Sequence, residues 1–174
     1  MELDKIIEQR YSVRKFKKEP LSSEHITAIL NAGHKAPTGC NYQPQRILVI
    51  NSESAIEKLK TCTKCHFNAP TAFLVCHNQN ESWVRKYDGA LSSPVDASIV
   101  ATHMMLKAHD IGVGCCWVMH FNPFAIKEAF SIPNGVEPVA LLVMGYPAID
   151  AEPIEMHFKK RPIEEVVFYN EFKK

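Results

Sequence analysis

A basic segment near the N-terminus combines residue types that can hold a phosphate. In Arg10-Tyr11-Ser12-Val13-Arg14 the arginines and the serine occupy alternate positions. Alternate side chains of an extended segment share one face. A guanidinium group can donate hydrogen bonds to two oxygens of the same phosphate. The segment therefore predicts a phosphate site. A solvated basic strand paired with surface carboxylates is an equally weighted alternative, because short basic runs are common on surfaces.

A second basic cluster, Lys159-Lys160-Arg161, lies far away in the sequence. A phosphate monoester carries a charge of about −1.5 to −2 at neutral pH and needs more than one cation. The two clusters can therefore converge on one phosphate. Taken alone, the second cluster is more typical of a solvated surface.

The stretch Ala36-Pro37-Thr38-Gly39-Cys40-Asn41-Tyr42-Gln43-Pro44 offers hydroxyl, amide and backbone groups without charge. Such groups can contact the edge of a planar heterocycle. An ordinary loop is the alternative, since Pro-Thr-Gly also favours a turn.

The cysteines and histidines do not form a metal-binding pattern. Cys62 and Cys65 have Cys-x-x-Cys spacing and His66 follows, but a structural zinc site needs four ligands and no second pair is evident. We therefore expect free thiols and no metal.

There is also no Gly-x-Gly-x-x-Gly motif, so we expect no Rossmann unit for a nicotinamide cofactor.

Helical and strand patterns alternate along the chain and predict one domain, residues 1–174, of the α/β or α+β sandwich class. The expected strands are Arg46–Ile50, Ala72–Cys76, Cys115–Met119 and Val139–Met144. The expected helices are Leu3–Gln9, Ser22 or Ser23 to Gly33, Ser52 or Ser54 to Lys60, Pro94–His109 and Asn122–Phe130.

Two of these segments need cover from other parts of a protein. The helix at Pro94–His109 is apolar on most sides, which predicts burial nearly all round. The tail from Pro162 carries Val166, Val167, Phe168, Tyr169 and Phe172. It is too apolar to remain exposed and must cover its own core or that of a partner.

Composition excludes several classes of function. The 174 residues include 20 basic and 19 acidic ones, and the net charge of +1 gives no field for nucleic acid or an anionic membrane. No apolar run reaches the ~18–20 residues of a membrane span. The charged N-terminus lacks the apolar region of a secretory signal, so we expect a cytoplasmic protein with reduced cysteines.

The ordered set of motifs resembles the nitroreductase family. Besides the arginine segment and the Ala36–Pro44 stretch, the resemblance rests on Gly112–Trp117, Pro138–Pro147 and Lys159–Val167. It implies an α+β fold: a three-layer sandwich whose central, mostly antiparallel sheet is flanked by helices. It also implies an intertwined homodimer that binds FMN.

The same resemblance implies a role for each site residue. The residues near the flavin phosphate and ribityl chain are Arg10, Tyr11, Ser12, Arg14, Lys159 and Arg161, with Tyr11 standing where many members have a second arginine. The residues near the ring system, supplied by the other chain, are Pro37, Thr38, Gly39, Asn41 and Gln43. The backbone N–H groups of Met119 and His120 would approach flavin N5.

The implied activity is an FMN-dependent oxidoreductase. Hydride passes from NAD(P)H through flavin N5 to a small acceptor, such as a nitroaromatic or a quinone, by a ping-pong mechanism. Two alternatives stay open: an FMN-binding sensor or carrier without turnover, and specialised chemistry such as reductive dehalogenation. No catalytic acid is assigned, and NADH and NADPH both remain candidates.

Overall fold

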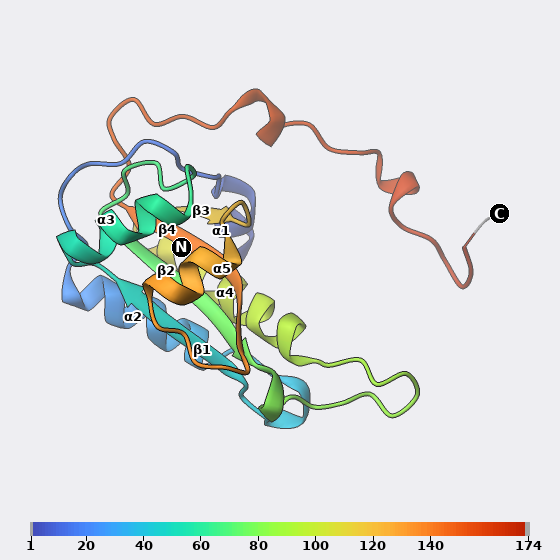
Figure 1. Cartoon of the computed structure of the whole chain (residues 1–174). Coiled ribbons are helices and arrows are strands. Elements are labelled where there is room, and N and C mark those ends of the chain that lie inside the picture. The colour runs from blue at the N-terminus through green and yellow to red at the C-terminus, as the bar shows by residue number, and fades with distance from the viewer. Residues whose placement is uncertain (1, 173–174) are drawn as a thin grey trace.

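The computed structural model describes residues 2–172 and centres on one antiparallel sheet (Figure 1). Its strands are β1 (Gln45–Ile50), β2 (Thr71–Asn78), β3 (Gly114–Val118) and β4 (Val136–Gly145). Their order across the sheet is β1-β2-β4-β3, and each neighbouring pair is antiparallel. The expected α+β class with an antiparallel sheet is confirmed.

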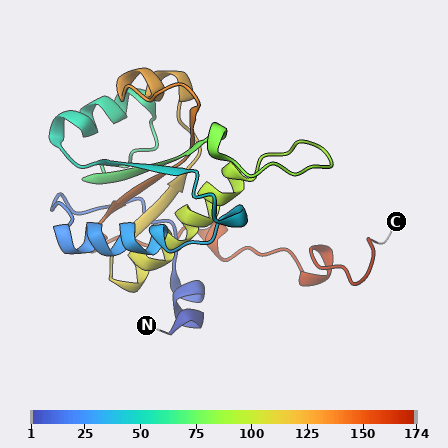
Figure 2. The same cartoon turned by 90° about the horizontal axis from the view of Figure 1, so that it is seen from below.

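Helices cover both faces of this sheet. They are α1 (Leu3–Gln9), α2 (Ser23–His34), α3 (Glu53–Cys62), α4 (Ser93–Asp110) and α5 (Pro123–Ala129). The pair α2 and α4 packs on one face and the pair α3 and α5 lies on the other, as Figure 2 shows. The expected three-layer sandwich is therefore confirmed.

The predicted N-caps begin three of these helices. The side chain of Ser22 accepts a hydrogen bond from the His25 nitrogen, and Ser52 accepts one from Ala55. Asn122 accepts from two backbone nitrogens at the start of α5, where Pro123 occupies the first helical position. Each cap pairs backbone N–H groups that have no partner within the helix.

The strand ends differ from the sequence prediction, and Pro138 explains one difference. β4 begins at Val136 and contains Pro138, which has no N–H to donate. β3 pairs with β4 only from Leu141 onward, so β4 has no neighbour on that side at Pro138. On the other side the register with β2 shifts between Val75 and Cys76. The bulge and the free edge together accommodate the proline.

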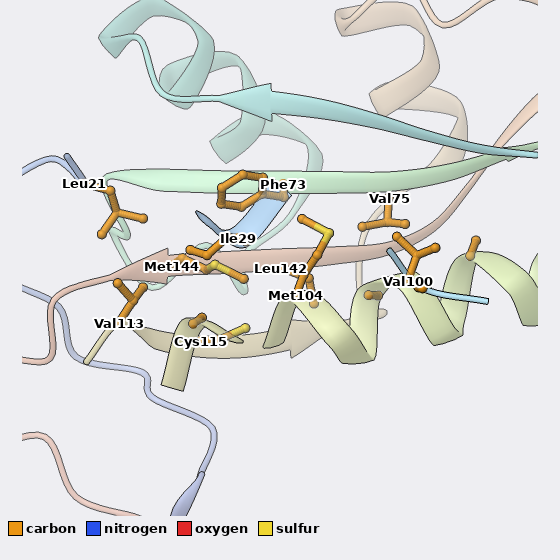
Figure 3. Close-up of a cluster of buried hydrophobic side chains, with 14 residues drawn as sticks. Leu21, Ile29, Phe73, Val75, Val100, Met104, Val113, Cys115, Leu142 and Met144 are labelled. Atoms are coloured by element: carbon orange, nitrogen blue, oxygen red, sulfur yellow. The ribbon is translucent and has the colours of Figure 1, made fainter. Parts of the chain in front are cut away.

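The sheet separates two apolar clusters. The cluster in Figure 3 joins Phe73 and Leu142 of the sheet to Val100 and Met104 of α4. α2 lies close to α4 at Gly33, where a Cβ atom would be 2.8 Å from the Met104 side chain. This close approach fixes the position of α4 across the sheet.

The expectation that α4 is buried nearly all round is wrong for a single chain. Its sheet-facing residues are buried, but Val95 is 61% exposed. An apolar helix that keeps one uncovered face within its own chain has surface available for a partner.

The C-terminal segment after β4 leaves the body of the protein (Figures 1 and 2). From Tyr146 to Phe172 no residue is buried, and Phe158 and Phe172 are largely exposed. The tail was expected to cover either its own core or that of a partner. The described residues of the tail do not cover their own core, so the first expectation is wrong. Cover of a partner stays a prediction. Across residues 2–172, no helix has the length and hydropathy to cross a bilayer.

Candidate functional site

The arginine segment runs beside β3, at the edge of the sheet. The Val13 nitrogen donates to the Cys115 oxygen at 3.0 Å, and Ser12 pairs with Cys115 in a parallel bridge. Val13 is buried against Gly114, where a Cβ atom would lie 2.9 Å from Val13 Cγ2. Since Val13 faces the core, Ser12 and Arg14 face the other way, as their alternation predicts. Both line one cavity of about 200 Å³.

Arg14 carries a charge that no described carboxylate neutralises. Its Nη1 donates to the Ser12 backbone oxygen at 3.1 Å, and its guanidinium carbon lies 5.9 Å from the centre of the Phe67 ring. Arg14 forms no salt bridge within residues 2–172. The alternative of a surface ion pair is therefore wrong for this arginine, and its remaining N–H donors are available to an anion.

Arg10 lies apart from that cavity. It caps the C-terminal end of α1, where its nitrogen donates to the Ile6 oxygen at 3.1 Å. Its charge acts on His109 near the end of α4: burial, and then Arg10, lowers the pKa of that histidine. Because Arg10 does not line the cavity of Ser12 and Arg14, a single chain does not place both arginines on it.

Tyr11 holds the beginning of the C-terminal segment. Its hydroxyl donates to the Ala151 oxygen at 3.0 Å, and its ring meets His157 edge-on with centroids 6.3 Å apart. The contact brings residues 153–157 to the wall of the Arg14 cavity. Tyr11 thus positions a segment of chain instead of supplying a cation.

Lys159 and Arg161 follow this segment but point to carboxylates of their own tail. Lys159 Nζ lies 2.6 Å from Glu155 Oε1, and Arg161 Nη1 lies 3.8 Å from Glu165 Oε2. Both pairs are exposed. Within one chain, the expected convergence of the two basic clusters on one point does not occur.

The loop of residues 37–43 is a turn held by hydrogen bonds to Asp96 of α4 and within the loop. Asp96 is 3% exposed, and its Oδ1 accepts from the Gly39 nitrogen at 2.8 Å while its Oδ2 accepts from the Ser92 hydroxyl at 2.8 Å. The Gln43 nitrogen donates to Thr38 Oγ1 at 3.1 Å. Non-glycine residues in this loop with positive φ are Cys40, Asn41 and Gln43. Such a backbone persists only where neighbouring contacts maintain it.

The role of Asp96 was not predicted from the sequence. An acidic residue in the first turn of a helix is common near the positive end of the helix dipole. The available signal was its position in an otherwise apolar pattern, where a buried carboxylate requires hydrogen-bond donors.

This loop and the arginine segment lie at opposite ends of α4. Gly39 contacts the first turn of the helix, whereas Arg10 acts on His109 in the last turn. A helix of 18 residues is ~27 Å long. The residues expected near the flavin ring are therefore separated, within one chain, from those expected near its phosphate.

Met119 and His120 lie at the end of β3, on the same edge as Arg14. With Arg14 and Phe67 they line a hollow of about 220 Å³. Both are exposed, and neither backbone N–H donates to any group in residues 2–172. β3 ends at Val118, so these two amides extend past the ladder. They are free to donate to a ligand lying along this edge, a feature that sequence patterns do not reveal.

All six thiols are free. Cys62 ends α3 and is buried, and Cys65 is half-buried in the loop that follows. Burial raises the pKa of Cys76 to about 12 and also raises that of Cys115. Among the described residues, no group of three or more metal-ligating side chains could hold a metal ion.

An antiparallel sheet between two helical layers defines an α+β protein, with the Arg14 guanidinium and the free amides of Met119 and His120 at the end of β3. The model described as the nitroreductase family matches residues 7–68 and 62–146. The chain belongs to the nitroreductase family.

The structural relatives include a crystal structure of a nitroreductase family protein from Clostridium difficile 630. It is 38% identical, covers 99% of this chain and 100% of its own, and has a TM-score of 0.92. A protein of Methanothermobacter thermautotrophicus, provisionally named an NADH dehydrogenase/NAD(P)H nitroreductase, is 28% identical over 155 residues, which are 85% of this chain and 78% of the relative. An NADPH-dependent oxidoreductase of Staphylococcus saprophyticus is 26% identical over 83% of this chain. The match spans 64% of that relative's length.

Proposed function

We propose that this protein is an FMN-dependent oxidoreductase that takes hydride from NAD(P)H and passes it to a small acceptor by a ping-pong mechanism. The observation that carries the proposal is the edge of β3. There the unneutralised guanidinium of Arg14 and the free amides of Met119 and His120 line one hollow. The names of the relatives support the chemistry, since they include NADPH-dependent oxidoreductases and a provisional NAD(P)H nitroreductase.

The residues along this edge fit the parts of FMN. Ser12 and Arg14 offer a hydroxyl and a guanidinium group to the phosphate, which is dianionic near neutral pH. The amides of Met119 and His120 offer neutral donors to the N5 edge of the ring. When bound, FMN supplies the atom that accepts and donates hydride, while the protein supplies position and electrostatics.

The beginning of the tail lies beside the cavity that is proposed to hold the phosphate. The cavity of Arg14 is already lined by Pro153, Ile154, Met156 and His157, and Lys159 follows two residues later. In the exposed tail Lys159 is engaged only by Glu155, in a surface pair of small energetic value. A phosphate is a stronger competitor, so Lys159 and Arg161 are proposed to join Arg14 when the tail docks. Tyr11 lines the same cavity and is proposed to support this side, as is Arg10 from outside the cavity.

A second copy of the chain completes the ring side. The loop residues proposed to contact the ring are Pro37, Thr38, Gly39, Asn41 and Gln43. Their own α4 separates them from Arg10 by most of its ~27 Å length, so they are proposed to serve the partner's flavin. The exposed apolar residues of the tail and Val95 of α4 provide the surface for such a homodimer. An intertwined dimer of this kind should bury ~2,000 Å² or more.

The test of this function begins with the flavin itself. The purified protein should be yellow with about one FMN per chain, and added FMN should raise the melting temperature, because a ligand that binds only the folded state stabilises it. A colourless protein whose melting temperature does not respond to FMN would contradict the proposal.

The mechanism is tested by reduction and by steady-state kinetics. NADH or NADPH should bleach the bound flavin under anaerobic conditions, and double-reciprocal plots with a quinone or a nitroaromatic should be parallel. Flavin that binds but is not bleached by either donor identifies the alternative, a sensor or carrier without turnover. Intersecting lines would exclude the ping-pong mechanism and leave the oxidoreductase assignment in place.

A further inference from the structure

A hollow of about 630 Å³ is lined in part by Met119 and His120 but not by Arg14. Its walls come from two segments, residues 60–64 at the end of α3 and residues 119–122 after β3. We call it the Lys60–Lys64 hollow. None of its residues outside Met119 and His120 has a role in the function proposed above.

The walls of this hollow are tied to each other. Thr63 Oγ1 donates to the His120 oxygen at 2.5 Å, and the Asn122 nitrogen donates to the Cys62 oxygen at 2.9 Å. Thr63 is 6% exposed, so the first of these bonds is protected from water. The end of α3 is therefore fixed to the same segment whose free amides face the flavin edge.

The hollow is electropositive. Lys64 is exposed and makes no ion pair within the described part of the chain. Lys60 lies 2.6 Å from Glu57, whose carboxylate neutralises one of the two charges. Burial lowers the pKa of His66, the charge of Lys60 lowers it further, and the charge of Glu57 opposes both. One uncompensated cation thus remains on one wall, and the opposite wall includes Met119 and His120.

We propose that the Lys60–Lys64 hollow binds an anionic group, a phosphate or a carboxylate, of the small molecule that exchanges hydride at the Met119–His120 edge. The inference rests on the proposed function, because only a flavin at that edge brings the hollow next to reacting atoms. Lys64 is the principal contact, and Lys60 acts with it when it turns from Glu57. The anion can belong to the donor, as the 2′-phosphate of NADPH, or to the acceptor, as a carboxylate.

The experiment compares Lys64→Ala and Lys64→Glu with Lys58→Ala. Lys58 is an exposed lysine of α3, six residues before Lys64, that does not line the hollow, so it is the matched control. Isothermal titration calorimetry measures binding of two ligand pairs, each differing by one anion. The first pair is 2′,5′-ADP and 5′-AMP, and the second is 4-nitrobenzoate and nitrobenzene. The titrations are run with FMN present and with the flavin removed.

We expect Lys64→Ala to weaken binding of the member with the additional anionic group in one pair by ~5-fold, as for a partly exposed ion pair, and Lys64→Glu to weaken it more. Loss confined to 2′,5′-ADP assigns the anion to the donor, and loss confined to 4-nitrobenzoate assigns it to the acceptor. Lys58→Ala should bind all four ligands as the wild type does.

Two results would overturn the inference. One is unchanged binding of both 2′,5′-ADP and 4-nitrobenzoate in Lys64→Glu, and the other is an equal loss for the members with and without the additional anionic group in each pair. FMN content serves as a separate readout, because Lys64 does not line the cavities of Arg14. A wild type that binds no FMN refutes the proposed function, whereas a wild type full of FMN with Lys64-independent anion binding refutes only the hollow.

Discussion

The carboxylate of Asp96 and the backbone nitrogen of Gly39 lie 2.8 Å apart, joining the first turn of α4 to a loop that is 57 positions away in sequence. The same carboxylate also receives the Ser92 hydroxyl. One buried charge therefore maintains a turn whose backbone contains three left-handed non-glycine residues, Cys40, Asn41 and Gln43. The conformation of the proposed ring-contacting loop depends on the core of the fold.

Replacement of Asp96 should therefore affect both stability and cofactor binding. In Asp96→Ala the Gly39 N–H loses its acceptor, and we expect the free energy of unfolding to fall by about 1–3 kcal/mol. FMN affinity should fall as well, since the loop is no longer held. Urea denaturation and fluorescence titration with FMN measure the two effects. Asp96→Asn keeps an oxygen acceptor and should lose less of each, and equal behaviour of the two variants would argue against this account.

Arg14→Ala should weaken FMN binding by roughly 10–150-fold, the value of one charge-assisted hydrogen bond of ~1.5–3 kcal/mol. Arg10→Ala should also weaken binding, though less, because Arg10 does not line the cavity. Arg85→Ala is the control, since its guanidinium pairs with Asp88 in a remote exposed turn. Flavin affinity measured for all three decides the assignment, which fails if Arg14→Ala binds FMN as tightly as the control.

The shared site predicts complementation between two defective proteins. Arg14→Ala and Asn41→Ala homodimers should each hold less flavin than the wild type. In a mixed dimer, one site carries both defects and the other carries neither. After the two variants are refolded together, flavin content should exceed the mean of the parents. Tagged purification shows whether mixed dimers form. If they form and their flavin content equals only the mean of the parents, each site lies within one chain. A monomer with full FMN occupancy would exclude the shared site.

His77 should make the protein less stable in mild acid. Its Nδ1 lies 2.8 Å from the Ser93 hydroxyl, and burial lowers the pKa of the ring in the folded protein, against a smaller opposing effect of Glu137. Since an unfolded histidine titrates near ~6.5, the unfolded state takes up the proton first as the pH falls. The contribution of His77 is thus complete above that pH and is lost as the pH falls toward the folded pKa.

The measurement is the free energy of unfolding at about pH 7.5 and pH 5.5 for the wild type and for His77→Gln. The variant should show a smaller loss between the two values. Some loss should persist, because the pKa values of His66 and His109 are lowered in the same direction. An identical loss in both proteins would remove His77 from the explanation.

The sequence contained enough to predict the elements and part of the site. N-cap residues such as Ser22 and Asn122 mark helix starts because their side chains pair with local backbone groups. The alternation of Ser12 and Arg14 likewise depends only on neighbouring residues. The contacts between residues distant in sequence were not predicted, namely Asp96 with Gly39 and Tyr11 with Ala151. The free amides of Met119 and His120 were not predicted either, because they depend on β3 ending at Val118. The exposed face at Val95 was missed because apolar periodicity does not tell which chain provides the cover.

Neither apolar cluster of the sandwich contains a residue beyond Tyr146. The residues that form the apolar core and the proposed docking segment therefore lie in separate parts of the chain. A protease that removes the tail should leave a folded body that has lost Lys159 and Arg161. Change can then accumulate in the last residues without disturbing the sheet, so affinity for a second copy and for the phosphate can evolve independently of the stability of the body.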